Sequence, residues 1–277
     1  MKVAVELQPD QQAVRWDDHV GVYEAVFEPL TNAFARRALD HLDLHAGDRL
    51  IDVGAGNGGT ALLAAARGAN VLAVDASRKM VARICERANK LSTGRIDAEV
   101  MDGTALALPD ARFDAAISVF GVILFPDAEK GLREIARVLK PGGRVAIVTW
   151  TETERYELAS RLQAAIAQVR GPQPPPKSLP AQLRFREEPA FRSLIARAGL
   201  VVQEIVRLEE RWRLPSARWL ADRIAFAPGL SAVFDAMGAD RQAVVEAFVS
   251  ALERDQGRGE VELVAVAHVG VGVKQNA

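Results

Sequence analysis

A glycine-rich turn near residue 50 carries the strongest chemical signal in the chain. The apolar stretch Leu50–Val53 is followed by Gly54, Gly56 and Gly58, and then by an Ala- and Leu-rich segment from Thr60 to Arg67. Glycine adopts positive φ and has no Cβ, so a ligand can approach the backbone closely at such a turn. The following segment predicts a helix whose free N–H groups and positive dipole end point at that ligand. These residues therefore predict a site for a nucleotide-like cofactor.

An acid ends the next apolar segment and suits the same kind of ligand. Asn70–Asp75 indicates a second strand, and Asp75 lies 21 positions after Gly54. A carboxylate at this place accepts hydrogen bonds from ribose hydroxyl groups. Gly54, Gly56 and Gly59 also fit the dinucleotide-binding pattern G-x-G-x-x-G. An NAD-dependent oxidoreductase therefore remains an alternative on these residues.

Three later segments follow in a characteristic order. They are Ala98–Gly103, Leu108–Ser118 and Val138–Ile147, the last of which contains Leu-Lys-Pro-Gly-Gly. With the glycine turn and Asp75, this set resembles the class I S-adenosylmethionine (SAM)-dependent methyltransferases, and most of all the small-molecule branch that includes the ubiquinone and menaquinone C-methyltransferases. The resemblance extends to Trp150 and weakens beyond it. It implies an α/β fold with a seven-stranded, mostly parallel Rossmann-like sheet, helices on both faces and an antiparallel last strand.

The periodicity of the chain predicts a single domain in three parts. Apolar residues between Tyr23 and Phe34 recur at helical spacing, which predicts an N-terminal helical lid over residues 1–46. Residues 47–152 form the cofactor-binding core, in which apolar strands alternate with helices and so favour a parallel sheet. Residues 153–277 supply a helical substrate cover and the C-terminal strands. The expected strands lie near Arg49–Val53, Val71–Asp75, Ala98–Met101, Phe113–Val119, Arg144–Trp150, Val201–Leu208 and Val261–Val273, and a stiff proline-rich connector lies at 171–176.

The resemblance also implies which residues contact SAM. The glycine turn would surround the methionine part, Asp75 would hold the ribose, and Asp102 would accept from the exocyclic amine of adenine beside Gly103. Asp75 and Asp102 have a second interpretation as turn or capping residues, and Met80 as a core residue. The cofactor-binding residues implied in this way are Tyr23, Gly54, Ala55, Gly56, Asn57, Gly58, Asp75, Ala76, Met80, Asp102, Gly103 and Phe120.

The segment at the end of the fourth expected strand limits which kinds of molecule can be the methyl acceptor. Many methyltransferases that act on amines and bases carry Asp or Asn followed by Pro-Pro-Tyr, whereas this chain has Ser118–Val122 there, with no side-chain acceptor for an amine proton. The sequence therefore favours O- or C-methylation of an aromatic or lipid-derived small molecule. His19 is the candidate base, with a surface histidine as the alternative. The residues expected to line the acceptor site are Trp16, Val122, Phe125 and Trp150.

Composition and cysteine content agree with a cytoplasmic enzyme. The formal net charge of the 277 residues is −1, which gives no general attraction to nucleic acid. We find no apolar segment long enough to cross a bilayer and no secretory leader, and so expect no membrane contact. Cys85 cannot form an intrachain disulfide and is expected in the core. His41 and His45 are spaced as on one helical face, but their surroundings lead us to expect no metal site.

The expected partner is a small-molecule methyl acceptor. The sequence leaves monomer and homodimer open. It also leaves open a non-catalytic protein that binds SAM, because a fold and a cofactor do not establish turnover.

Overall fold

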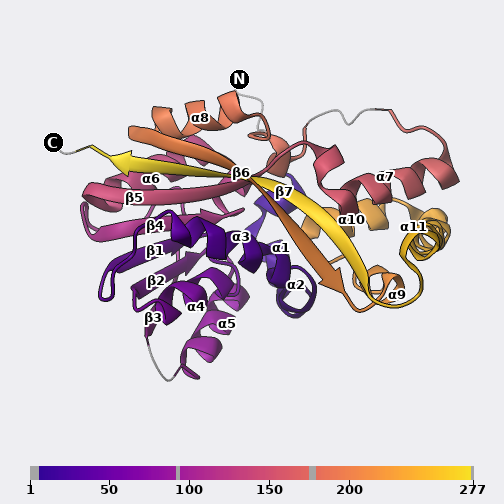
Figure 1. Cartoon of the computed structure of the whole chain (residues 1–277), viewed down its shortest axis with the longest axis horizontal. Coiled ribbons are helices and arrows are strands. Elements are labelled where there is room, and N and C mark those ends of the chain that lie inside the picture. Colours follow the sequence, from indigo (N-terminus) through magenta and orange to yellow (C-terminus); the bar gives the residue numbers. More distant parts are fainter. Residues whose placement is uncertain (1–5, 92–93, 175–178, 276–277) are drawn as a thin grey trace.

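Seven strands form one mixed sheet in the computed structural model, which describes residues 6–91, 94–174 and 179–275. The order is β3-β2-β1-β4-β5-β7-β6; the first five strands pair in parallel, and β7 is antiparallel to both β5 and β6. The predicted α/β fold with an antiparallel last strand is confirmed (Figure 1). The strands are β1 (Arg49–Val53), β2 (Asn70–Asp75), β3 (Arg95–Val100), β4 (Phe113–Val119), β5 (Leu139–Trp150), β6 (Leu200–Leu214) and β7 (Val261–Lys274).

Helices cover both faces of this sheet. They are α3 (Glu28–Asp40), α4 (Gly59–Ala66) and α5 (Arg78–Ala88) on one face, and α6 (Ala128–Val138) and α8 (Glu188–Arg197) on the other. The pairing of β5 with β7 shows which helices lie on which face. Ile147 pairs with Gly270, so these two residues point to the same face. Trp150 lies three residues further along β5 and therefore points to the opposite face. Gly270 packs against Phe191 of α8, whereas Trp150 contacts Phe34 of α3.

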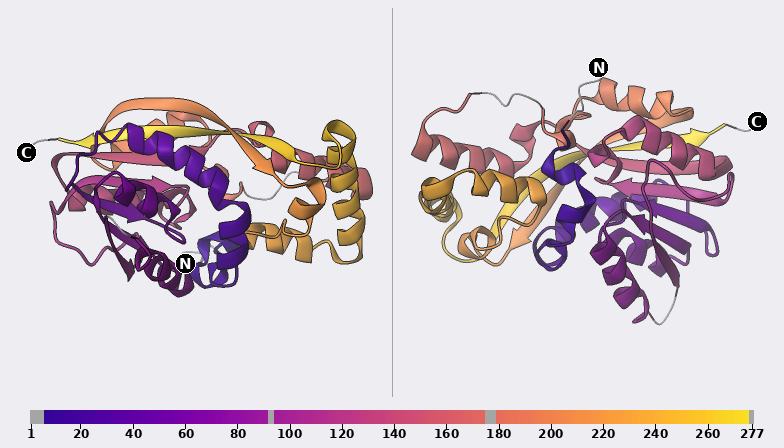
Figure 2. Two further views of the ribbon diagram at one scale, coloured as in Figure 1. Left: turned by 60° about the horizontal axis from the view of Figure 1, so that its bottom comes forward. Right: turned by 180° about the vertical axis from the view of Figure 1, so that it is seen from behind.

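Further elements extend beyond the sheet and surround the ends of its strands. Figure 2 shows the short helices of the lid between the sheet and the helices of the cover, and Figure 1 shows β6 and β7 reaching into the cover. The lid consists of η1 (Pro9–Gln11), α1 (Ala13–Trp16), α2 (Val20–Val26) and α3. The cover consists of η3 (Thr153–Arg155), α7 (Glu157–Arg170), η4 (Ala181–Leu183), α9 (Ala217–Ala221), α10 (Pro228–Asp235), η5 (Gly238–Asp240) and α11 (Arg241–Gln256), and η2 (Val122–Leu124) follows β4.

The lid is broken into pieces, unlike the continuous pattern in the sequence. α2 ends at Val26, and α3 begins after Phe27 with Pro29 as its second residue. Proline has no N–H group and cannot continue the hydrogen bonds of the preceding helix. The predicted helical face is therefore divided, since Tyr23 and Phe27 line a cavity whereas Phe34 is buried in the core.

Three expectations about local structure were wrong. β5 begins earlier than predicted, at Leu139, because Lys140–Gly143 is a bulge that interrupts its pairing with β4. β6 continues further than predicted, to Leu214. Cys85 is exposed on α5 rather than buried. Of the proline-rich connector, residues 175 and 176 lie outside the described residues.

The contact between β7 and α8 generates a stability prediction. A Cβ on Gly270 would lie 2.5 Å from Ile195 Cδ1 and 2.8 Å from Phe191 Cε1, and both of these side chains are fully buried. We expect Gly270→Val to lower the free energy of unfolding by about 1–3 kcal/mol through overpacking. Chemical denaturation measures the change. Gly259→Val is the control, because no atom lies within 4 Å of its Cβ position, and equal stability of the two variants would contradict the prediction.

Candidate functional site

A cavity of about 1120 Å³ lies where several parallel strands end. Its wall includes Asp75 at the end of β2, Phe120 directly after β4 and Trp150 at the end of β5. Residues of η1, α1 and α2 line it from the lid, and residues of α10 line it from the cover. Ligands of α/β proteins bind outside the carboxyl ends of the strands. The cavity is therefore the candidate site.

The glycine turn after β1 forms one part of this wall. Gly54 and Gly56 line the cavity and have φ of 72° and 56°. A Cβ on Gly54 would lie 2.9 Å from the Cα atom of Gly121, so this glycine is needed for the close approach of two chain segments. A Cβ on Gly56 would meet no atom within 4 Å, so it would occupy open space. The turn thus exposes backbone to the cavity, as its sequence predicts.

The other residues of the turn lie behind this wall. Ala55, Asn57 and Gly58, expected as cofactor contacts, do not line the cavity. Asn57 is 1% exposed, and its carbonyl oxygen accepts a hydrogen bond from Arg87. Gly58 precedes α4 with φ of 88°, and a Cβ there would lie 3.0 Å from Ile84. These three residues therefore belong to the turn without lining the cavity, whereas Gly54 and Gly56 line it.

Asp75 links the turn to β2. Its Oδ2 accepts a hydrogen bond from Gly56 N at 2.8 Å, and its Oδ1 accepts one from Ser77 N at 2.8 Å. A carboxylate oxygen has two lone pairs, so both oxygens retain capacity for a ligand hydroxyl. Burial raises the pKa of Asp75 to about 6, and the backbone N–H groups of Ser77 and Gly56 oppose that shift. Asp75 is therefore mostly ionised at neutral pH and able to accept from a ribose.

A second acid, Asp52 on β1, was missed by the sequence reasoning. Its side chain is buried, and its Oδ2 has no hydrogen-bond partner among the described residues. Burial and the charge of Asp75 raise the pKa of Asp52 to about 8. A nearby cation would favour the ionised form of such a group. The available signal was the acid itself, which interrupts an otherwise apolar strand.

The residues expected around adenine lie together in the wall. Asp102 and Gly103, which follow β3, line the cavity with Ala76 and Met80. Asp102 Oδ1 accepts hydrogen bonds from the backbone N and the Oγ1 of Thr104, both at 2.8 Å. The turn-forming interpretation is therefore correct for this oxygen, and it leaves Oδ2 for a ligand donor.

Phe125 lies at the cavity, next to the glycine turn. It lines the cavity, and its ring is so close to Gly103 and Gly131 that a Cβ on either would collide with it. Its Cε1 also lies 3.7 Å from the Cβ position of Gly54. Phe125 therefore borders the glycine turn and Gly103, and its assignment to the acceptor stays a prediction.

Aromatic rings form the opposite part of the wall. Phe120, with a positive φ of 58°, stacks on Trp150 with a centroid distance of 3.9 Å, and Trp150 stacks on Tyr156 at 4.8 Å. Phe27 of the lid stacks on Phe226 of the cover at 4.7 Å. Burial raises the pKa of Tyr156, so its phenol stays protonated. The aromatic residues that line the cavity are Trp16, Tyr23, Phe27, Phe120, Phe125, Trp150, Tyr156 and Phe226.

Two residues predicted for the site are elsewhere. Val122 is fully buried in η2 and is not part of the cavity wall. His19 does not line the cavity either; its Nδ1 lies 2.7 Å from the carbonyl oxygen of Arg15, and its Nε2 lies 3.0 Å from Ser231 Oγ. A carbonyl oxygen only accepts, so Nδ1 donates and Nε2 accepts from the hydroxyl. This ring connects the lid to α10, and the geometry gives no support to its role as a base.

The seam between lid and cover contributes residues that the sequence did not indicate. Ala181 N donates to Gln8 Oε1 at 2.8 Å, and Gly229 N donates to Asp10 Oδ1 at 2.6 Å. Gln8, Asp10 and Gly229 line the cavity, as do Tyr156 and Phe226. The helical pattern of the lid pointed to Phe27 only as a packing residue. No local signal marks Tyr156 or Phe226, because the fold alone brings them to the lid.

Two further expectations concern a metal site and a membrane-spanning helix. Among the described residues, no group of His, Cys, Asp or Glu side chains is arranged to bind a metal ion. His41 instead pairs with Glu204 at 2.7 Å, and His45 lies 3.7 Å from Asp48. No helix in the described ranges combines the length and apolar character needed to cross a membrane.

Comparison with known proteins identifies the domain. A family model described as a methyltransferase domain matches residues 51–147. The core of the chain is therefore similar to a methyltransferase domain. The chain is 38% identical over 134 residues to 27-O-demethylrifamycin SV methyltransferase of Amycolatopsis mediterranei (strain S699), a match that covers 48% of each protein, so it spans about half the length of that relative.

Two more proteins resemble the chain over a greater length. Nocamycin O-methyltransferase of Saccharothrix syringae is 27% identical over 244 residues, which cover 84% of this chain and 87% of that protein. The crystal structure of the (4+2)-cyclase SpnF matches with a TM-score of 0.62 at 19% identity and covers 100% of both chains. At this identity, the second match supports the fold of the methyltransferase domain and nothing further.

The cofactor of the methyltransferase domain is SAM, and the cavity suits it. The space beside Gly56, which a Cβ would fill, can accept the amino acid part of the cofactor. Asp75 lines the cavity and has acceptor capacity for ribose hydroxyls. Pockets for a single drug-sized ligand measure about 300–1,000 Å³. A cavity of about 1120 Å³ therefore has room for a cofactor and an acceptor.

The pKa of Asp75 leads to a prediction for binding. Ribose hydroxyls donate to the ionised carboxylate, and burial raises its pKa to about 6. The affinity for S-adenosylhomocysteine should therefore be constant just above neutral pH and decrease by up to about tenfold per pH unit below pH 6. Isothermal titration calorimetry between pH 5 and 7 measures this affinity. Asp75→Asn should bind more weakly and without this pH dependence, and a flat profile for the natural protein would refute the ribose assignment.

Proposed function

We propose that this protein is a SAM-dependent methyltransferase that methylates an oxygen or carbon atom of a small, largely apolar or aromatic molecule. The observation that carries the proposal is one cavity shared by the glycine turn with Asp75 and by a wall of aromatic rings. The family match of residues 51–147 supports the reaction type. The names of the rifamycin and nocamycin relatives both refer to a methylated oxygen, which favours oxygen as the methylated atom. We expect the enzyme to act in the cytoplasm, as a monomer or homodimer.

The residues of the chain have distinct parts in this reaction. Bound SAM supplies an electrophilic methyl group on a sulfonium. Gly54 and Gly56 allow the backbone to approach the amino acid part, and Asp75 orients the ribose through the oxygens that Gly56 and Ser77 already fix. Phe120 and Trp150 border the acceptor and exclude water from it. In such a displacement, alignment of the reacting atoms is the main contribution of a protein.

The charges around the cavity favour a neutral acceptor. The described wall holds one basic side chain, Lys130, and no arginine, so it offers no bidentate site for a carboxylate or phosphate group. Its acids are Asp10, Asp75, Asp102 and Asp127, which disfavour an anionic acceptor. Two of the acids, Asp75 and Asp102, are assigned to the cofactor. Stacked rings such as Phe120 and Trp150 offer flat apolar surface to an aromatic or polyketide-like molecule. The protonated phenol of Tyr156 adds a neutral polar group.

Methyl transfer is tested with the purified protein, SAM and a set of phenols, enols and hydroquinones. We expect S-adenosylhomocysteine and an acceptor that gains one methyl group, both measured by mass spectrometry. Gly56→Val should abolish turnover because the side chain fills cofactor space. Gly238→Val is a matched control, since Gly238 has φ of 55°, no atom within 4 Å of its Cβ position and no place in the cavity wall.

The outcomes distinguish the proposal from its alternatives. Tight binding of SAM without turnover on any acceptor would favour a non-catalytic SAM-binding protein. Binding of NADH with no binding of SAM would favour an oxidoreductase. Equal loss of turnover in Gly56→Val and Gly238→Val would mean that strain, rather than lost cofactor space, causes the effect.

Asp10 is the carboxylate that we propose as proton acceptor for a phenol or enol. It lines the cavity, and its Oδ1 is held by Gly229 N. Burial raises the pKa of Asp10, which brings it closer to the range of a useful base. We expect Asp10→Asn to lower kcat about 100-fold with unchanged affinity for S-adenosylhomocysteine. Asparagine preserves the acceptor for Gly229 N, so an unchanged kcat would show that Asp10 serves only to hold α10.

A further inference from the structure

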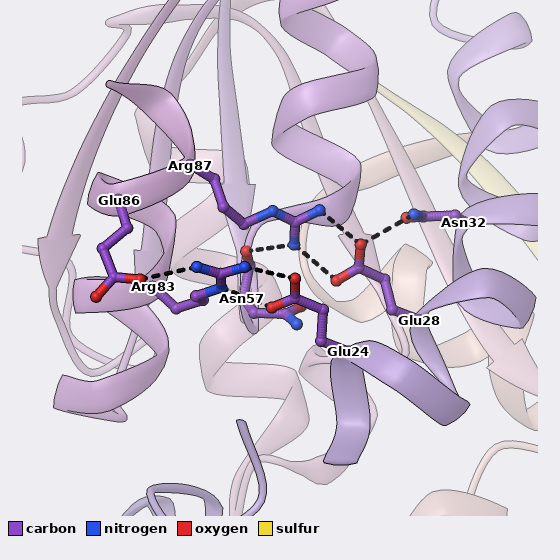
Figure 3. A network of polar contacts seen from close by, with 7 residues as sticks. All are labelled: Glu24, Glu28, Asn32, Asn57, Arg83, Glu86 and Arg87. Atoms are coloured by element: carbon purple, nitrogen blue, oxygen red, sulfur yellow. Dashed lines mark hydrogen bonds and ion pairs between the residues drawn. The ribbon is translucent and has the colours of Figure 1, made fainter. Parts of the chain in front are cut away.

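A network of charged side chains lies behind the glycine turn, outside the cavity (Figure 3). Arg87 of α5 donates to both carboxylate oxygens of Glu28, each at 2.7 Å, and to the carbonyl oxygen of Asn57 at 2.9 Å. The Glu28 side chain is 8% exposed and the Arg87 side chain 18% exposed. Asn32 Nδ2 also donates to Glu28 Oε1, at 3.2 Å. Charge-assisted bidentate bonds of this kind are strong and fix orientation.

The bond to Asn57 restrains the turn from the side opposite the cavity. Gly56, the neighbouring residue, donates its N–H to Asp75 on the cavity side. Gly54, Gly56 and Gly58 all have positive φ, and glycine gives a free chain many other conformations there. One short segment is thus bonded on both sides, by Asp75 and by Arg87. Without the second bond, the turn would have more freedom to leave the shape that the cofactor requires.

The same guanidinium restrains the lid. Glu28 is the first residue of α3 and directly follows Phe27, whose ring lines the cavity and stacks on Phe226 of the cover. Glu28 and Asn32 also occupy the space that a Cβ on Gly59 would take, so α3 lies directly against the start of α4. Arg87 therefore connects the cofactor turn with the residue next to an aromatic ring of the acceptor wall.

We propose that Arg87 and Glu28 are positioning residues that hold the lid and the glycine turn in a fixed position relative to each other. Cofactor binding then depends on an ion pair outside the cavity. This inference rests on the proposed function. Arg87 forms no hydrogen bond with a described residue of the cavity wall, and it acts through Asn57 and Glu28. Its effect is thus on the geometry of the site.

Arg83 provides a matched control one turn earlier on α5. It forms a bidentate pair with Glu24 of α2 at 2.6 and 2.7 Å and bonds Glu86 at 2.8 Å, and these bonds include no carbonyl of the turn. Arg83→Met therefore removes an ion pair between lid and α5 while the bond to Asn57 remains. Arg87→Met removes both the pair with Glu28 and the bond to the turn.

Calorimetry with S-adenosylhomocysteine tests the inference. We expect the Kd to rise at least about tenfold in Arg87→Met, the size expected for lost bonds to a charged group, and to stay within about twofold in Arg83→Met. Arg87→Lys should recover part of the affinity, because one ammonium can reach only some of the acceptors. Equal affinity of Arg87→Met and Arg83→Met would overturn the inference.

Hydrogen exchange without ligand provides a readout independent of the proposed function. Amides of residues 54–58 should exchange faster in Arg87→Met than in Arg83→Met, whereas amides of β4 and β5 should exchange equally in both. Unchanged protection of the turn would overturn the positioning role, even in a protein that binds no S-adenosylhomocysteine. Failure of the natural protein to bind that ligand would instead count against the proposed function.

Discussion

The site depends on the glycine turn, a backbone segment that must lack side chains toward the cavity and yet be held in place by hydrogen bonds. Gly56 leaves open space for a ligand because it has no Cβ, and Gly54, for the same reason, allows the close approach of Gly121. This lack of side chains also removes the packing that usually fixes a loop. Hydrogen bonds replace that packing. Asp75 accepts from Gly56 N, and Arg87 donates to Asn57 O. The cavity retains its shape because these bonds constrain a segment with little intrinsic preference.

Two buried acids lie at or near this turn. Burial raises the pKa values of Asp52 and Asp75 to about 8 and about 6, so at neutral pH Asp52 is mostly protonated and Asp75 mostly ionised. Asp75 lines the cavity, and its carboxylate can accept hydrogen bonds from the hydroxyl groups of a ligand there. Asp52 is not part of the described cavity wall, and its Oδ2 has no partner among the described residues. The acid at the end of β2, rather than the acid within β1, is therefore the one that faces a ligand.

The core of the fold could be predicted from the sequence, because its signals are local. Strands β1, β2 and β4 are short apolar segments. Gly54 follows β1, Asp75 ends β2 and Phe120 follows β4, and the order of the strands implies that these residues meet at one edge of the sheet. His19 and Val122 were also predicted from local signals, and these two predictions were wrong. Their types suited a site, but a bond to Ser231 and burial in η2 depend on parts of the chain that no local pattern brings together.

The aromatic wall could not be predicted from the sequence, because the fold brings its rings together from distant parts of the chain. The family model covers residues 51–147, which contain the glycine turn and Asp75. Phe27, Trp150, Tyr156 and Phe226 lie outside that range, in the lid, at the end of β5 and in the cover. The family model therefore covers the glycine turn and Asp75, whereas these four rings of the cavity wall come from segments outside it. The bond from Arg87, which lies inside that range, to Glu28, which lies outside it, joins the two parts.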